Sequence, residues 1–257
     1  MKTILITGAS SGFGKASAKL LAENGYKLIL VARRLELLKK LKDELKTDVY
    51  IASVDVQNKG QVKSLFEKLP EEYKKIDVLI NCAGLALGLD PAPEANLEDW
   101  ETMVDTNIKG TLYFTKFALE VMKKRNTGLI INIGSIAAFV PYKGGNVYGA
   151  TKAFIKQFSR NLRTDLLGSE IKVTNIEPGA VQTDFSLVRF KGDQEKADKV
   201  YENMRSLTAD DIAGTILWVI NQPQGVNIEN IEIMPLDQTF GGTVMNRRVP
   251  HTDSKIS

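Results

Sequence analysis

Thr7-Gly8-Ala9-Ser10-Ser11-Gly12-Phe13-Gly14 directly follows a short β-rich run and opens an amphipathic stretch. Glycines let a backbone turn tightly and approach a pyrophosphate, and the free N–H groups at a helix N-terminus attract negative charge. The order G-x-x-x-G-x-G differs from the more familiar G-x-G-x-x-G, and a plain tight turn would read the same way. The strand–turn–helix setting nevertheless predicts a dinucleotide-binding turn. Its expected cofactor contacts are Gly8, Ser10, Gly12, Phe13 and Gly14.

Outward from this turn, β-rich runs alternate with amphipathic stretches along the chain. The runs cover residues 4–7, 27–31, 49–54, 78–81, 128–134, 172–176 and 228–233. The amphipathic stretches cover residues 13–24, 35–45, 59–69, 100–125, 148–167 and 209–220. Apolar strands alternating with helices indicate a parallel sheet covered on both faces, and right-handed crossovers make it doubly wound. We therefore expect a single α/β domain over residues 1–257, a Rossmann fold with about seven parallel strands.

Two regions interrupt the alternation at the carboxyl ends of strands, where such sheets bind ligands. Residues 85–96 form a loop that contains Pro91 and Pro93. Residues 184–206 are polar and precede a helix that Thr208 is expected to cap, so we expect them to form a substrate lid. The tail, residues 235–257, shows no strand or helix pattern.

Composition excludes several classes of protein. The 34 basic and 31 acidic residues are interspersed and give a net charge of only +3, which argues against nucleic-acid binding. One cysteine and one histidine cannot build a zinc site, so no metal is expected. The N-terminal apolar run is too short for a secretory signal, and no apolar stretch reaches the ~18 residues that a membrane span needs. We expect a cytoplasmic protein that does not associate with a membrane.

The end of the second run indicates which dinucleotide binds. NAD-binding units carry an acidic residue there, whereas this chain has Arg33 and Arg34, which can bind a 2′-phosphate. Exposed charges at the start of a helix are the alternative. Ser10 could donate a further hydrogen bond to the phosphate, and Asp55 could accept one from the adenine amino group. NADP(H) is the predicted cofactor.

Tyr148 and Lys152 lie four residues apart and so share one face of a helix. A free tyrosine with a pKa of ~10 is a poor base at neutral pH, but a nearby cation favours the phenolate and can make it an acid/base catalyst. The same spacing is common in ordinary helices, so it predicts catalysis only in combination with other motifs.

Those motifs are present in order. Asn81-Cys82-Ala83-Gly84 follows the fourth run, Asn107 lies on the next helix, Ser135 follows the fifth run, and Pro178-Gly179-Ala180-Val181-Gln182-Thr183 follows the sixth. With the glycine turn and the Tyr–Lys pair, this set resembles the short-chain dehydrogenase/reductase family over nearly the whole chain. Cys82 departs from the family pattern, which usually has asparagine there, and is expected to be a small buried residue.

The resemblance implies a role for each motif. Ser135 would hold the substrate oxygen, Tyr148 would be the acid/base, Lys152 would lower its pKa and bind the nicotinamide ribose, and Asn107 would position a proton-relaying water. Val181 and Thr183 would hold the nicotinamide carboxamide. The remaining implied cofactor contacts are Val56, Asn81, Ala83, Gly84, Pro178 and Gly179.

Four stretches, residues 85–88, 98–103, 141–148 and 185–193, are similar to the subgroup of NADP-dependent 3-hydroxy acid dehydrogenases. That subgroup also oxidises serine and L-allo-threonine and reduces malonic semialdehyde. A small carboxylate suits an arginine fork, so Arg189 is our candidate for a substrate-binding residue. A solvated lid charge is the alternative for Arg189.

Other interpretations share these motifs. A broad-specificity carbonyl reductase or a 3-oxoacyl-carrier reductase would use the same catalytic residues. A non-catalytic NADP-sensing regulator would be expected to lack Tyr148 or Lys152. The resemblance also implies a homotetramer, in which Arg247, Arg248 and His251 of the tail either contact another subunit or belong to a disordered terminus.

Overall fold

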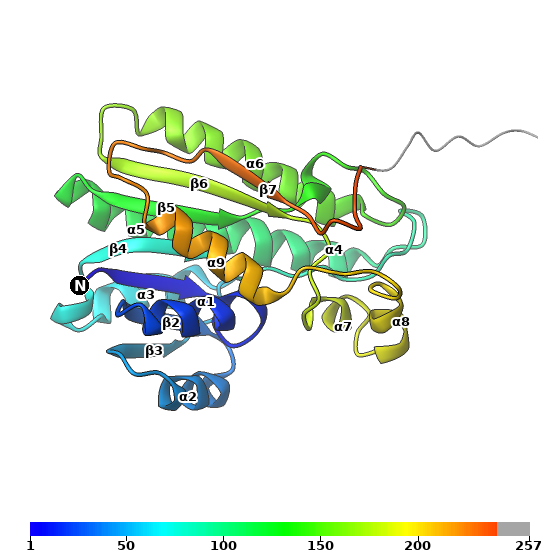
Figure 1. The fold of residues 1–257 in the computed structure, drawn as a ribbon, viewed down its shortest axis with the longest axis horizontal. Helices are drawn as coiled ribbons and strands as arrows, with labels where there is room; N and C mark the ends of the chain where they lie inside the picture. The colour runs from blue at the N-terminus through cyan, green and yellow to red at the C-terminus, as the bar shows by residue number, and fades with distance from the viewer. Residues whose placement is uncertain (241–257) are drawn as a thin grey trace, which may run out of the picture.

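A parallel sheet of seven strands lies at the centre of the computed structural model, which describes residues 1–240 (Figure 1). The strand order is β3-β2-β1-β4-β5-β6-β7, so the order reverses between β1 and β4. The strands are β1 (Thr3–Thr7), β2 (Lys27–Ala32), β3 (Val49–Ser53), β4 (Ile76–Asn81), β5 (Gly128–Ile133), β6 (Ile171–Pro178) and β7 (Asn230–Ile233). The predicted doubly wound α/β fold is confirmed.

Helices cover both faces of the sheet, as the continuous apolar strands require (Figure 1). One layer contains α1 (Gly12–Glu23), α2 (Leu35–Glu44) and α9 (Ala209–Ile220). The other contains α3 (Lys59–Lys68), α5 (Gly110–Arg125) and α6 (Asn146–Asp165). No helix within residues 1–240 is long and apolar enough to cross a membrane.

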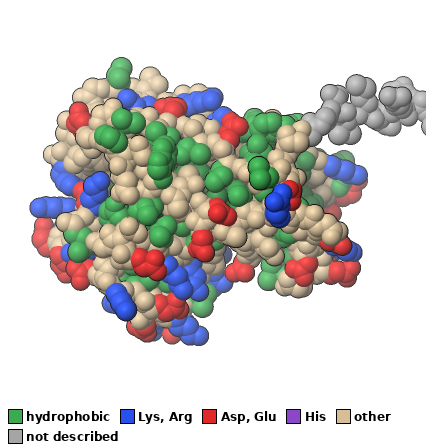
Figure 2. All heavy atoms as spheres, viewed as in Figure 1, with side chains coloured by type: hydrophobic (Ala, Val, Ile, Leu, Met, Phe, Trp, Pro, Cys, Tyr) green, Lys and Arg blue, Asp and Glu red, His purple; other side chains and the backbone are tan. Residues whose placement is uncertain are grey.

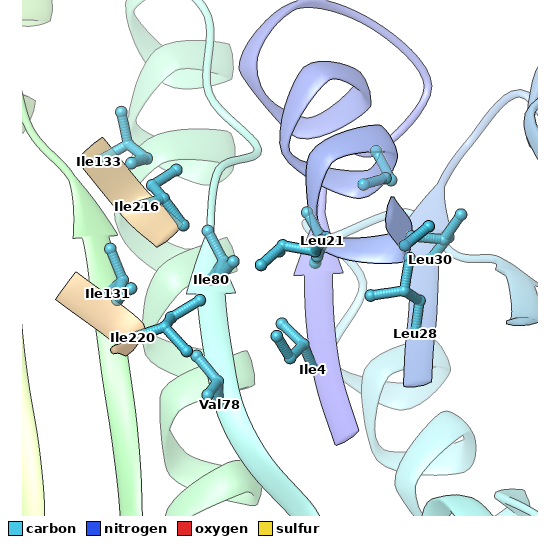
Figure 3. Packing of buried hydrophobic residues seen from close by; sticks show 14 of the residues in the cluster. Ile4, Leu21, Leu28, Leu30, Val78, Ile80, Ile131, Ile133, Ile216 and Ile220 are labelled. Atoms are coloured by element: carbon cyan, nitrogen blue, oxygen red, sulfur yellow. The ribbon is translucent and has the colours of Figure 1, made fainter. Parts of the chain in front are cut away.

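The core follows from the alternation of side chains along each strand. Ile4 packs with the α1 and α9 layer, whereas its neighbour Leu5 belongs to the opposite layer, and both are fully buried. Figure 3 shows Leu21 of α1 and Ile216 of α9 packed over the face of the sheet that the first layer of helices covers. Full burial of such a side chain contributes about 1.5–3 kcal/mol, so this packing holds the strand ends in place.

The predicted helix over residues 100–125 is wrong in detail. The structure has α4 (Leu97–Met103), then a π-helical turn (Val104–Lys109), then α5. The first helix begins earlier than expected because the Asn96 side chain accepts hydrogen bonds from the main-chain N–H groups of Glu98 and Asp99.

The region that follows β6 contains structure that the sequence pattern did not indicate. Two short helices, α7 (Phe185–Arg189) and α8 (Gln194–Lys199), lie in residues 184–206 (Figure 1). The expected cap at Thr208 is confirmed, because Thr208 and Asp211 form a capping box at the start of α9. Of the tail, residues 235–240 are described, and Arg247, Arg248 and His251 lie outside the described residues.

Four asparagines stand in register across the last four strands. Asn81 of β4 pairs with Asn132 of β5, which pairs with Asn175 of β6, which pairs with Asn230 of β7. The Asn81 amide donates to Asn132 Oδ1 at 2.8 Å, and the Asn175 amide donates to Asn230 Oδ1 at 2.7 Å. These amides form two buried or half-buried polar pairs; Asn81 and Asn132 lie near the carboxyl ends of their strands, whereas Asn230 begins β7.

Candidate active site

The glycine turn packs without spare room against the neighbouring strands. Gly8 has a φ of 68°, and a Cβ placed there would lie 2.9 Å from the Ala83 main chain. A Cβ on Gly14 would overlap the Gly8 carbonyl. The Ser11 side chain makes no cap at the start of α1, so the N–H groups of the first turn receive no hydrogen bond from it. This is the close backbone approach that a pyrophosphate needs.

The second strand brings a cation to the same turn. Arg34 Nη2 donates to the hydroxyls of Ser10 and Ser11, at 3.0 Å each. A guanidinium and two hydroxyls therefore cluster at the mouth of the turn, which suits a phosphate group. Arg33 is exposed next to it. Asp55 and Val56 follow β3, where Asp55 Oδ1 accepts from the Gln57 N–H at 3.1 Å.

Residues at and after the end of β4 pack against the end of β1, next to the glycine turn. The Thr7 hydroxyl accepts from the N–H groups of Cys82 and Ala83, at 3.0 Å each. Burial raises the pKa of the Cys82 thiol to about 12, although the residue as a whole is half-buried, so the expected burial applies to the thiol and not to the whole residue. The Asn81 side chain is turned into the sheet towards Asn132 and Thr115, so its predicted cofactor contact can come only from its main chain.

Asn107 lies in the π-helical turn and is almost fully buried. Its side chain donates to Thr151 Oγ1 at 3.0 Å, and it both accepts from the Leu85 N–H and donates to the Leu85 carbonyl. A Cβ on Gly84 would lie 3.3 Å from Asn107 Oδ1 and 3.6 Å from Lys152 Nζ. The structure thus brings Asn107, Gly84 and Lys152 together, as the motifs predict.

Lys152 and Tyr148 share one face of α6, but they do not interact as the sequence predicts. The buried Lys152 Nζ donates to the Ile133 carbonyl at 2.7 Å and lies 5.8 Å from the centre of the Tyr148 ring. Burial lowers the pKa of Lys152 to about 8.

The predicted lowering of the Tyr148 pKa by Lys152 is wrong for this structure. Burial raises the pKa of Tyr148 to about 12, and the main opposing influences are the Arg189 charge and a hydrogen bond with Ser135. The Arg189 guanidinium is the nearer of the two cations, at 5.0 Å from the ring centre against 5.8 Å for the Lys152 ammonium.

Arg189, at the end of α7, lies among three aromatic rings. Its guanidinium is 5.0 Å from the Tyr148 ring centre, 4.9 Å from that of Phe185 and 5.9 Å from that of Tyr142. Its Nη2 donates to the Tyr142 hydroxyl at 3.1 Å, while its Nε is buried with no partner among the described residues. Sequence reasoning missed Tyr142 and Phe185, because no motif marks either residue as a neighbour of Arg189.

The loop after β6 completes the site. The Ser135 hydroxyl accepts from the Ala137 N–H at 3.1 Å and lies 3.5 Å from the Pro178 carbonyl. A Cβ on Gly12 would lie 3.9 Å from Thr183 Cβ, so this loop reaches back to the glycine turn. Arg34 and two serine hydroxyls thus cluster at the glycine turn, and the Tyr148 phenol, the Ser135 hydroxyl and the Arg189 guanidinium form a second polar cluster. Such an arrangement can hold an extended dinucleotide beside a small oxygen-bearing substrate.

Known proteins resemble this chain over most of its length. It is 54% identical over 245 residues to the NADP-dependent 3-hydroxy acid dehydrogenase YdfG of Salmonella typhi, covering 95% of this chain and 99% of that protein. It is 49% identical to the serine 3-dehydrogenase of Rhizobium radiobacter, covering 93% of this chain and 96% of that protein.

A solved structure of a closed serine dehydrogenase complexed with NADP+ has a TM-score of 0.94 and 51% identity, and the match covers 96% of this chain and 100% of that one. The family model for short chain dehydrogenases matches residues 2–194, the part that carries the glycine turn, Ser135, Tyr148 and Lys152. With the fold, the motifs and these relatives in agreement, the chain belongs to the short-chain dehydrogenase family.

Proposed function

We propose that this chain is an NADP-dependent oxidoreductase acting on a small 3-hydroxy acid, with a hydride moving between the nicotinamide and the carbon that bears the 3-hydroxyl or 3-oxo group. Serine, L-allo-threonine and the 3-hydroxypropionate/malonic semialdehyde pair are the expected substrates. The relatives named for 3-hydroxy acid and serine dehydrogenation support this substrate class.

The residues fit NADP(H). Gly8 and Gly14 let the turn pack closely against its own neighbours, and Arg34 with Ser10 and Ser11 would hold the 2′-phosphate. Lys152 Nζ keeps donors beyond the one given to the Ile133 carbonyl, and these would bind ribose hydroxyls. When bound, the cofactor supplies the hydride chemistry.

The chain's own residues would manage the proton. With a pKa of about 12, the Tyr148 phenol is protonated at neutral pH, so it can donate its proton to a carbonyl oxygen that becomes a hydroxyl. The Ser135 hydroxyl would donate a hydrogen bond to the same oxygen. In the oxidation direction Tyr148 must first lose its proton, so oxidation should become faster as the pH rises. Asn107 remains the predicted holder of the relaying water.

The position of Arg189 carries the substrate assignment. A guanidinium stacked over the acid/base tyrosine, with one buried N–H that has no partner among the described residues, suits a carboxylate a few ångströms from the reacting oxygen. A lysine would suit this place less well, because the planar guanidinium both stacks on rings and offers several donors.

Initial rates with NADP+ against serine, L-allo-threonine and 3-hydroxypropionate test the proposal, with neutral alcohols of similar size for comparison. Arg189→Leu should raise KM for the acids by about 10- to 100-fold, from the loss of a hydrogen bond to a charged group, and should change KM for neutral alcohols little. Lys199→Leu removes one exposed charge from the same region and is the matched control. Equal effects of Arg189→Leu on acids and alcohols would refute the carboxylate assignment. Faster turnover of 3-oxoacyl thioesters than of free acids would favour the carrier-reductase alternative.

We also propose a homotetramer and a substrate lid over residues 184–206. Hydrophobic side chains gather on the face that carries α9 and the edge strand β7 (Figure 2), and Trp218 there is 51% exposed. A second copy of the chain covering this face would bury that apolar surface. Light scattering after size exclusion tests the assembly, and a monomer or a dimer would refute the homotetramer. The cytoplasmic location stays a prediction.

A further inference from the structure

The chain beyond β7 packs against the loop that follows β6. We call residues 234–240 the strap and residues 178–183 the carboxamide loop. Gln238 Oε1 of the strap accepts from the Ala180 N–H at 2.7 Å, and the N–H of Gly179 donates to the Ile233 carbonyl at 2.8 Å. The N–H of Gln238 donates to the Pro235 carbonyl at 3.0 Å, which closes a turn and fixes the glutamine. The strap and the end of β7 are thus joined to the carboxamide loop through main-chain donors of the loop.

The strap and the loop are packed tightly as well as hydrogen bonded. A Cβ on Gly179 would lie 2.9 Å from Met234 Cγ and would overlap the Gln238 amide. On the other side of Ala180, its carbonyl accepts from the Leu207 N–H at 3.0 Å. Both polar main-chain groups of Ala180 are therefore used, and its N–H depends on the Gln238 side chain.

The strap is itself anchored at two further places. Asp237 accepts from Arg205 three times, from the main-chain N–H at 2.8 Å, from Nε at 3.2 Å and from Nη2 at 2.8 Å. Hydrogen bonds from Arg205 hold the pKa of Asp237 down at about 2. Phe240 packs edge-on against Phe139, at 5.5 Å between ring centres, just beyond the short turn that Ser135 begins. The strap thus contacts Arg205, ahead of α9, and Phe139, after β5, as well as the carboxamide loop.

We infer that Gln238 is a positioning residue for the nicotinamide. By holding the Ala180 N–H from outside, it sets where Val181 and Thr183, the next residues of the loop, present their groups to the carboxamide. This inference rests on the proposed function, because it requires a nicotinamide cofactor. A shift of the loop by a fraction of an ångström would misplace the reacting carbon, on which hydride transfer depends steeply.

Two variants of Gln238 separate its hydrogen bond from its size. Gln238→Met keeps the length of the side chain but removes the carbonyl acceptor, whereas Gln238→Glu keeps an acceptor oxygen. Gln224→Met is the matched control, because Gln224 is exposed and bonds Glu170 at the amino end of β6. We expect Gln238→Met to weaken NADPH binding by about ten-fold, from an N–H left without its acceptor, and to lower kcat with little change in the substrate KM. Gln238→Glu should restore most of both.

The decisive comparison uses two ligands, NADPH followed by its fluorescence and 2′-phospho-ADP-ribose, which lacks nicotinamide, followed by calorimetry. Gln238→Met should bind the second ligand as the native protein does. Unchanged NADPH affinity, or equal loss for both ligands, would overturn the inference. If Gln238→Met does not fold, Asp237→Asn loosens the strap without touching Ala180. This variant should also bind NADPH more weakly, by a smaller factor, and bind 2′-phospho-ADP-ribose as the native protein does. An Asp237→Asn variant whose affinity for the two ligands is unchanged or falls equally would also overturn the inference. Failure of the native protein to bind NADPH would instead refute the proposed function.

Discussion

Lys152→Met should make the protein more stable while abolishing its activity. Burial lowers the pKa of Lys152 from 10.5 to about 8, a penalty of about 3 kcal/mol on the folded state at neutral pH, since each pKa unit corresponds to about 1.4 kcal/mol. The exchange also loses the hydrogen bond to the Ile133 carbonyl, which costs about 1 kcal/mol. The free energy of unfolding at pH 7 should therefore rise by about 2 kcal/mol.

The pH dependence gives this prediction its sharpest form. Between the folded pKa and the unfolded pKa of Lys152, the unfolded chain binds a proton that the folded chain does not, so native stability increases with pH through that window. The variant has no such group. Its advantage over the native protein should therefore shrink by about 2 kcal/mol between pH 7 and pH 10.

Urea unfolding followed by circular dichroism, without nucleotide and at one fixed protein concentration, measures both quantities. Lys40→Met, on an exposed position of α2, controls for the exchange itself. A variant that is less stable than the native protein at pH 7, or a difference that does not change up to pH 10, would refute the reasoning that burial opposes the charge of Lys152.

Three further predictions concern the site. Arg34→Asp should weaken NADPH binding by about 10- to 100-fold through loss of a charged hydrogen bond and leave NADH binding nearly unchanged. Parallel titrations with NADPH and NADH measure this, and equal losses of affinity for both nucleotides would contradict the role assigned to Arg34. Gly14→Ala should destabilise the chain by about 1–3 kcal/mol by overpacking against the Gly8 carbonyl. Gly214→Ala, in the open space on α9, should instead stabilise it slightly. Thermal unfolding of the two variants measures the difference. Burial raises the pKa of Tyr148 and the Arg189 charge lowers it. The rate of oxidation at saturating substrate should therefore increase with pH, and Arg189→Leu should move this increase to higher pH while leaving the rate of reduction unchanged. An increase that moves to lower pH in the variant would contradict this.

The sequence predicts the sheet and most helices because both depend on local patterns. Uninterrupted apolar runs predict strands buried on both faces, and the glycine turn predicts the crossing from β1 to α1. The π-helical turn that holds Asn107 could not be predicted, because its extra residue leaves no mark in the spacing of apolar side chains. The short helices α7 and α8 were missed for a related reason, since their 5 and 6 residues are too few to show a periodicity.

The motif residues could be assigned from the sequence, but their electrostatics could not. The i, i+4 spacing places Tyr148 and Lys152 on one face, yet burial and Arg189, which is far away in the sequence but close in space, decide the pKa of the phenol. Residues such as Tyr142 and Gln238 act through contacts between segments far apart in the chain. Only the folded arrangement shows those contacts.

The paired asparagines of the last four strands have an evolutionary consequence. An amide at Asn132 gives the Asn81 amide an acceptor, and Asn230 does the same for Asn175. Replacing one member by an aliphatic side chain leaves the other amide without its hydrogen-bond partner. This costs more stability than replacing both members by apolar side chains of the same shape. During evolution of this gene, the two asparagines of each pair should therefore change together or stay unchanged. A substitution of only one of them by leucine should be selected against.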